Sequence, residues 1–236
     1  MTAEQKSMPG EHHHQHRDVT GGWIRPAVFG VTDGLVSNAA LIAGVVGAQV
    51  STHNVILTGL AGLAAGAFSM ATGEYVSVAS QAEVTRAEIE IEKREIERVP
   101  QAEEAELAAI YVGRGIEPAL AKEVARQLSK DPEQVWRVHA REELGVDPDD
   151  LPSPWTAAFS SFLAFSIGAL LPVLPYLLGA TSLTLALGLA GVGLFTAGAV
   201  VSRFTTRSWV YAGSRQLLLG AAAAVLTYAI GSAIGS

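Results

Sequence analysis

Five long runs of apolar residues constrain this chain more than any other feature of its sequence. Each run comes close to the roughly 20 residues that an α-helix needs to cross the hydrocarbon core of a bilayer. Five such helices are too many to be the buried core of a soluble domain in a chain of 236 residues. The sequence therefore predicts an all-α membrane protein with five transmembrane helices. They lie near residues 27–50, 55–78, 156–179, 182–202 and 208–234.

The charged residues are concentrated in two parts of the chain. They make up 17% of it, below the roughly 25% of soluble domains. Nearly all lie before residue 26 or between residues 74 and 150. We therefore predict four regions: a polar, His-rich N-terminal tail (1–24), transmembrane helices 1 and 2 (25–80), a cytoplasmic acidic helical metal-binding insert (81–153), and transmembrane helices 3 to 5 (154–236).

The net charge and the residue types exclude some partners. The formal charge is −7, and the middle segment supplies the excess acid. This balance disfavours nucleic acid and favours cations. The chain has no cysteine, so disulfides, thiolate metal sites and thiol catalysis are excluded. The N-terminal stretch 12-HHHQH-16 could bind metal, but we assign it no role.

The placement of Lys and Arg predicts the orientation in the membrane. Basic residues precede the first apolar run, fill the insert, and flank the turn near 203–208, whereas the loops 51–54 and 179–182 have none. Loops rich in Lys and Arg stay in the cytoplasm. We expect the N-terminus, the insert and the 203–208 turn to be cytoplasmic, and Ser236 to lie on the far side.

The insert itself predicts a small set of helices. The first covers 82–99, continues the second apolar run out of the membrane, and ends at Pro100, which cannot continue a helix without a break. Further helices are expected near 101–113, near 117–130, and from the N-cap residue Asp131 to about Gly145.

The first two insert helices place several carboxylates at helical spacing. Glu88, Glu92 and Glu95 share one face of the first helix. Like charges at this spacing destabilise a helix. After the Pro100 break, Glu103 and Glu106 repeat an i, i+3 spacing. Two such pairs on adjoining helices can converge on a divalent cation, because hard cations prefer carboxylate oxygens.

The last insert helix offers a different ligand type. His139 and Glu143 stand at i, i+4, a spacing that lets both bind one ion, and a His would favour a transition metal. The alternative is a solvated, salt-bridged helical hairpin with surplus acid, in which Glu90 pairs with Arg94. Spacing alone leaves both interpretations open.

The first two apolar runs carry ionisable residues. Asp33 lies in the first run, and Met70 and Glu74 lie at i, i+4 in the second, toward the cytoplasmic side in the predicted orientation. Ionisable residues inside a membrane usually face a bundle interior and mark an ion path. Carboxylates with a thioether would suit a borderline-soft divalent ion, and could take up protons when it leaves. The alternative is an interfacial position for both carboxylates.

Three motifs together resemble the vacuolar iron transporter family, the iron and manganese transporters of plants, fungi and bacteria. They are 33-DGLVS-37, 66-GAFSMATGEYVSV-78 and 164-AFSIGALLPVLPY-176, and the resemblance covers about residues 25–235. It implies a five-span protomer that works as a homodimer, with the ion path lined by the first two spans. It also implies a cytoplasmic metal-binding domain and Fe²⁺/H⁺ exchange out of the cytosol.

The resemblance also assigns site residues by position. Asp33 and Met70 match the family's metal-translocating residues, and Glu74 its acid in the second span. The paired acids of the insert correspond to Glu92, Glu95, Glu103 and Glu106, and its last-helix acid to Glu143. One position departs from the pattern, because His139 stands where plant members often have Met.

The resulting hypothesis is a secondary transporter and not an enzyme. It would export Fe²⁺, with Mn²⁺ as a second substrate, in exchange for protons, without a permanently bound cofactor. One rival is a membrane ferroxidase, although its di-iron site would want Glu-x-x-His pairs on two helices. The other rival is a metal-sensing or storage-associated protein. We expect a bacterial inner membrane, with a vacuolar-type membrane as the alternative.

Overall fold

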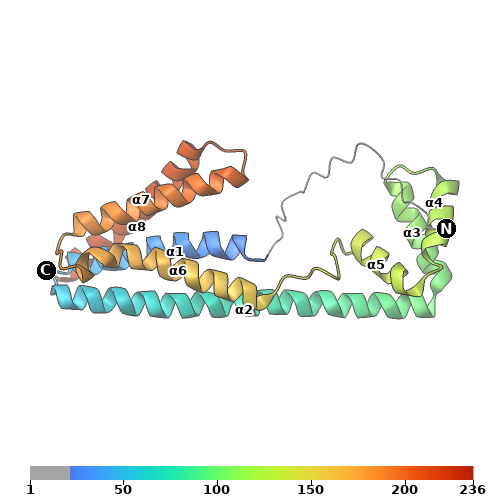
Figure 1. Cartoon of the computed structure of the whole chain (residues 1–236), viewed down its shortest axis with the longest axis horizontal. Coiled ribbons are helices and arrows are strands. Elements are labelled where there is room, and N and C mark those ends of the chain that lie inside the picture. The colour runs from blue at the N-terminus through green and yellow to red at the C-terminus, as the bar shows by residue number, and fades with distance from the viewer. Residues whose placement is uncertain (1–21, 236) are drawn as a thin grey trace, which may run out of the picture.

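The molecule is a bundle of helices at one end of a long helical rod, with a smaller group of helices at the other end (Figure 1). The computed structural model describes residues 22–235, and within this range the chain forms helices and no strands. The prediction of an all-α fold is confirmed. Most of the predicted N-terminal tail, including its His cluster, lies outside the described residues.

Within residues 22–235, five helices are long and apolar enough to cross a membrane, as predicted. A short 3₁₀ turn, η1 (Ser202–Phe204), extends the fourth. Large apolar side chains such as Phe68, Leu163 and Leu218 are exposed on the outside of the bundle, as expected for surfaces that face lipid. The five helices are α1 (Ile24–Gly47), α2 (Thr52–Arg98), α6 (Pro154–Leu177), α7 (Leu183–Val201) and α8 (Trp209–Gly235).

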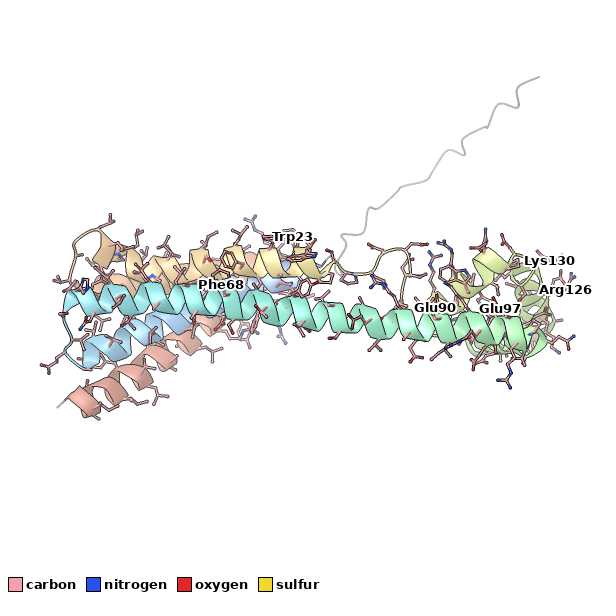
Figure 2. The ribbon with its side chains drawn as sticks, turned by 90° about the horizontal axis from the view of Figure 1, so that it is seen from below. Trp23, Phe68, Glu90, Glu97, Arg126 and Lys130 are labelled. Atoms are coloured by element: carbon pink, nitrogen blue, oxygen red, sulfur yellow. The ribbon has the colours of Figure 1, made fainter. Side chains whose placement is uncertain are left out.

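Helix α2 belongs to both ends of the molecule. Its 47 residues span about 70 Å at 1.5 Å per residue, more than twice the roughly 30 Å of a bilayer's hydrocarbon core. Its apolar first part, up to about residue 80, packs in the bundle and carries a single Glu, Glu74, whereas its second part carries the other Glu residues and all the Lys and Arg residues of the helix. Figure 2 shows Phe68 on the part of α2 that runs along the bundle, and Glu90 and Glu97 on the projecting part.

Three short helices pack at the projecting end of α2: α3 (Pro100–Gly113), α4 (Pro118–Leu128) and α5 (Pro132–Glu142). All three begin with Pro at the first helical position, where the missing N–H costs nothing. Asp131 caps α5 as predicted, because its side chain accepts a hydrogen bond from the Glu133 N–H. Leu107, Ala108 and Ala125 form the small core of this group.

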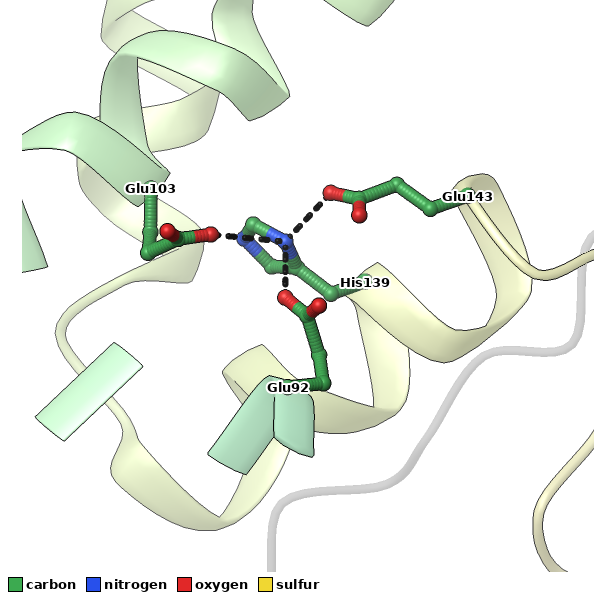
Figure 3. A group of neighbouring side chains, drawn as sticks. All are labelled: Glu92, Glu103, His139 and Glu143. Atoms are coloured by element: carbon green, nitrogen blue, oxygen red, sulfur yellow. Dashed lines mark hydrogen bonds and ion pairs between the residues drawn. The ribbon is translucent and has the colours of Figure 1, made fainter. Parts of the chain in front are cut away.

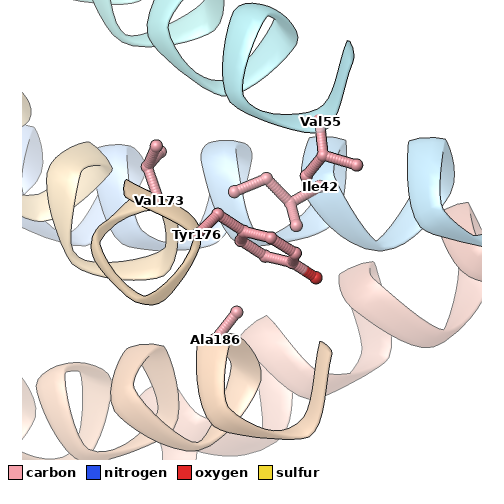
Figure 4. Packing of buried hydrophobic residues seen from close by; sticks show 5 residues of the cluster. All are labelled: Ile42, Val55, Val173, Tyr176 and Ala186. Atoms are coloured by element: carbon pink, nitrogen blue, oxygen red, sulfur yellow. The ribbon is translucent and has the colours of Figure 1, made fainter. Parts of the chain in front are cut away.

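The membrane bundle is built around α1, which contacts α2, α6, α7 and α8. Figure 4 shows the cluster where four of these helices meet. Ile42 from α1 packs with Val55 from α2, with Val173 and Tyr176 from α6, and with Ala186 from α7. All five residues are buried, so they form a core at this end of the bundle.

Helices α1 and α6 approach each other through glycine. A Cβ atom at Gly34 would lie 2.3 Å from the Phe165 carbonyl oxygen, and one at Gly168 would lie 2.3 Å from the Val31 carbonyl oxygen. Small residues permit such close approach of backbones in lipid. Gly73 differs, because nothing lies within 4 Å of the place where its Cβ would be. Close packing therefore explains the glycine beside Asp33 and not the glycine beside Glu74.

Candidate metal centres

Four side chains from three helices converge in the group at the end of α2. They are Glu92 from α2, Glu103 from α3, His139 from α5, and Glu143, which caps the end of α5. One potential ligand atom of each lies within 4.8 Å of all the others. Figure 3 shows the three carboxylates arranged around the imidazole ring. The interruption of the helix before Pro100 makes this possible, because it lets α3 fold back beside α2.

The imidazole ring has too few protons for the acceptors around it. Its Nδ1 atom lies 2.7 Å from Glu143 Oε1, 2.8 Å from Glu92 Oε1 and 3.9 Å from Glu103 Oε2. This nitrogen carries at most one proton, so it cannot donate to both of the near carboxylates. The other ring nitrogen, Nε2, is buried without a hydrogen-bond partner. A cation between these atoms would satisfy several of them at once.

Burial makes this concentration of negative charge costly. Glu92 and Glu103 are each only 7% exposed, and His139 is fully buried. Burial raises the pKa of Glu92 to about 7, and the carboxylate of Glu143 adds to the shift while His139 opposes it. Burial also raises the pKa of Glu103, again with a contribution from neighbouring carboxylates. The group therefore holds protons near neutral pH that a metal ion would displace.

The basic side chains of this region have other partners. Lys93 Nζ lies 2.8 Å from Glu90 Oε1 and 4.3 Å from the centre of the Trp136 ring. Lys93 is thus the closer partner of Glu90, and the charge of Arg94, the predicted partner, also lowers the pKa of Glu90. Among residues 22–235, the ion pairs of the three clustered carboxylates all lead to His139. No Lys or Arg ion pair in that range therefore neutralises the cluster.

The remaining predicted acids of the insert lie around the cluster and outside it. Glu95 and Glu106 are exposed, but their charges contribute to the raised pKa values of Glu92 and Glu103, respectively. Glu88 is also exposed and lies one turn before Glu92. The structure thus brings together four of the seven candidate ligands that the sequence offered in the insert.

A second candidate site lies in the membrane bundle, in a cavity of about 240 Å³. Asp33 from α1 and Met70 from α2 line it together, so the structure places these two predicted residues at one site. Its polar lining also includes Ser37, Asn38 and Ser69, which the sequence analysis did not propose as site residues. A signal for two of them was present, since Ser37 and Asn38 follow Asp33 by about one helical turn. Leu41, Gly62, Gly66 and Phe165 complete the lining.

Glu74 lies outside this cavity and has a basic partner. Its Oε2 atom lies 3.1 Å from Arg25 Nη2, at the start of α1. The Glu74 side chain is 9% exposed and that of Arg25 is 77% exposed. The ion pair therefore ties α2 to the beginning of α1, and Glu74 does not line the cavity that Asp33 and Met70 share.

The fold and the two candidate sites define a class: a helical integral membrane protein with a buried cluster of three carboxylates and a His outside the bundle and a cavity lined by one carboxylate inside it. Comparison with known proteins gives the family. The chain belongs to the VIT family, which matches residues 24–232. The resemblance seen in the sequence is thereby confirmed.

Individual relatives match over most of the chain. It is 38% identical over 221 positions to the vacuolar iron transporter of Acanthamoeba castellanii, an alignment that covers 90% of this chain and 78% of the relative. It is 32% identical over 238 positions to vacuolar iron transporter 1 of Oryza sativa subsp. japonica, with 99% and 94% covered. It is 36% identical over 168 positions to vacuolar iron transporter 1 of Arabidopsis thaliana, with 71% and 67% covered.

Proposed function

We propose that this protein transports Fe²⁺, with Mn²⁺ as a second substrate, across a membrane in exchange for protons. The observation that carries the proposal is the buried group around His139, where two carboxylate oxygens lie 2.7 and 2.8 Å from one nitrogen. Oxygen ligands with one imidazole suit a first-row divalent metal. The names of the relatives, all vacuolar iron transporters, point to the same substrate class.

The two sites have different roles in this proposal. Residues 81–153 form the cytoplasmic metal-binding domain, which captures the ion and raises its concentration near the membrane. Asp33 and Met70 then bind it inside the bundle, where the cavity brings a carboxylate and a thioether together. Protons replace the metal on the carboxylates when it leaves, because a buried carboxylate without a partner cation favours its neutral form. This alternation couples metal movement to proton movement.

Orientation, assembly and location complete the proposal. The N-terminus, the insert and the turn near 203–208 face the cytoplasm, in keeping with their Lys and Arg residues. The working unit is a homodimer, and the membrane is a bacterial inner membrane.

The structure weighs against the ferroxidase alternative. A di-iron bundle site takes a Glu from each of two helices and a Glu-x-x-His pair from each of two others. The described group has one His, and its ligand atoms lie within 4.8 Å of one another, a space suited to a single ion. A sensing or storage role would also use this group, but it would not require the cavity that Asp33 and Met70 line in the bundle.

Transport in proteoliposomes tests the proposal. We expect the wild-type protein to move Fe²⁺ into vesicles with an acidic lumen, and collapse of the pH gradient to slow the flux. Asp33→Ala should reduce the flux at least about tenfold, since loss of a ligand worth about 1.4 kcal/mol has that effect. Asp150→Ala, at an exposed position of the insert, is the matched control. A wild-type protein that binds Fe²⁺ and shows no flux would support sensing or storage instead.

A further inference from the structure

Asn38 is a buried amide whose orientation is fixed by two helices. Its Nδ2 atom donates to the Gly59 carbonyl oxygen of α2 at 3.1 Å and to the Ala169 carbonyl oxygen of α6 at 2.6 Å. The reversed amide would set Oδ1 against two carbonyl oxygens, so the hydrogen bonds themselves determine which end is which. The residue is only 2% exposed.

The other end of the amide has no hydrogen-bond partner. Asn38 Oδ1 is buried and unpaired, a state that destabilises a fold when nothing compensates it. The oxygen lies beside Gly62 of α2, because a Cβ atom placed at Gly62 would come within 2.9 Å of it. Asn38 and Gly62 both line the cavity that Asp33 and Met70 share. The residue that carries the unpaired oxygen therefore forms part of the wall of this cavity.

We propose that Asn38 Oδ1 is a neutral oxygen ligand for the divalent cation in the membrane cavity, next to the Asp33 carboxylate and the Met70 thioether. This inference rests on the proposed function. An amide oxygen is a hard ligand, so it favours Mn²⁺ and Fe²⁺ over later, softer metals. It also carries no charge, so it adds affinity without adding a group that must be protonated when the ion leaves.

A purely structural role for Asn38 would depend only on the two hydrogen bonds that Nδ2 donates. One substitution separates this structural role from the proposed role of Oδ1 as a metal ligand. Gly62→Ala puts a methyl group over Oδ1 and leaves both carbonyl acceptors of Nδ2 in place. The added carbon would also meet Leu41 Cδ2 at 2.6 Å, but this is the free end of a flexible side chain. Gly73→Ala is the matched control on the same helix, because nothing lies within 4 Å of its added carbon.

The first readout is metal preference in proteoliposomes that contain Mn²⁺ or Co²⁺. We expect Gly62→Ala to lower the ratio of Mn²⁺ flux to Co²⁺ flux at least about fivefold, because the cavity loses its hard neutral oxygen. Asn38→Leu should lower the ratio likewise, and Gly73→Ala should leave it unchanged. An unchanged ratio in Gly62→Ala, or an equal loss of flux for both metals, would overturn the proposal.

The second readout is Mn²⁺ binding in detergent, which does not require transport. In the full chain carrying Glu92→Gln and Glu143→Gln, the insert site is weakened and the membrane cavity remains. Adding Gly62→Ala to this background should weaken Mn²⁺ binding at least about fivefold, whereas adding Gly73→Ala should not. If Gly62→Ala weakens binding but the wild-type protein shows no flux, the ligand role of Asn38 is supported and the proposed transport function is contradicted. If Gly62→Ala leaves Mn²⁺ binding unchanged, the ligand role of Asn38 is contradicted, whether or not the wild-type protein transports metal.

Discussion

At the scale of single residues, the insert site depends on one nitrogen atom with two carboxylate neighbours. Glu92 and Glu143 both approach His139 Nδ1 within 2.8 Å, and a single proton can satisfy one of them. The surplus of acceptors is balanced by protons in the metal-free protein, since burial raises the pKa of Glu92 to about 7. Proton release is therefore part of metal binding at this site.

The consequence is a pH-dependent affinity with a definite sign. Below a pH of about 7, Glu92 is mostly protonated, and a metal ion must displace its proton. Above that pH the carboxylate is already ionised. We expect the affinity of the insert for Mn²⁺, measured by calorimetry, to fall about tenfold between pH 8 and pH 6, as the ionised fraction of Glu92 falls by that factor.

The control for this prediction lies on the same helix. Glu92→Gln should bind Mn²⁺ more weakly at pH 8 and lose most of the dependence on pH. Glu97→Gln removes an exposed carboxylate of α2, and this variant should keep the wild-type dependence of Mn²⁺ affinity on pH. A wild-type affinity that is flat from pH 8 to pH 6 would contradict the role given to Glu92.

At the scale of elements, two helix arrangements hold the sites in place. Helix α2 carries Met70 in the bundle and Glu92 in the insert, so one continuous helix positions a ligand of each site. Helices α1 and α6 are held at backbone contact by Gly34 and Gly168. This contact positions Asp33, which adjoins Gly34, and it brings the Ala169 carbonyl oxygen within reach of Asn38.

Gly34→Ala should disturb that contact. The added carbon would lie 2.3 Å from a backbone oxygen of α6, which cannot move without shifting the helix, and such overpacking costs about 1–3 kcal/mol. We expect a lower midpoint of thermal unfolding in detergent than for the wild-type protein. Gly188→Ala in α7 is the comparison, because nothing lies within 4 Å of its added carbon. Equal midpoints for the two variants would argue against close packing at Gly34.

At the scale of the whole molecule, the two candidate sites are well separated. Met70 and Glu92 are 22 residues apart on α2, which corresponds to about 33 Å along a helix. A metal ion cannot contact both sites at once. In the proposed function, capture in the insert and passage through the bundle are therefore distinct binding events, and each should stabilise its own part of the molecule.

Hydrogen exchange can resolve these parts. Mn²⁺ at about 100 times the dissociation constant of the insert stabilises the bound form by about 2.7 kcal/mol. We expect amide exchange to slow by up to about 100-fold in α3, α5 and the part of α2 around Glu92, and to stay unchanged in α8. Glu92→Gln with Glu143→Gln should abolish this protection. Protection that spreads equally over all helices would indicate one site coupled to the whole fold.

Much of the fold and part of each site could be predicted from the sequence because the signals are local. Length and apolarity predict the five spans, and Pro100, Pro118 and Pro132 mark where helices begin. Helical spacing identifies Glu92, Glu103, His139 and Glu143 as candidate ligands. Helical spacing cannot distinguish these four residues from Glu88, Glu95 and Glu106. The spacing gives the position of a residue around the axis of its own helix, but it does not give the relative orientation of three helices.

The sequence by itself determined which residues form helices, which helices can enter a membrane, and that acid is concentrated outside it. Only the tertiary structure decided which acids meet, that Glu74 pairs with Arg25, and that Asn38, with an unpaired amide oxygen, lines the same cavity as Asp33 and Met70. The physical reason is the separation of the partners along the chain. Asn38 is oriented by a carbonyl group 131 residues away, and helix packing alone brings the two together.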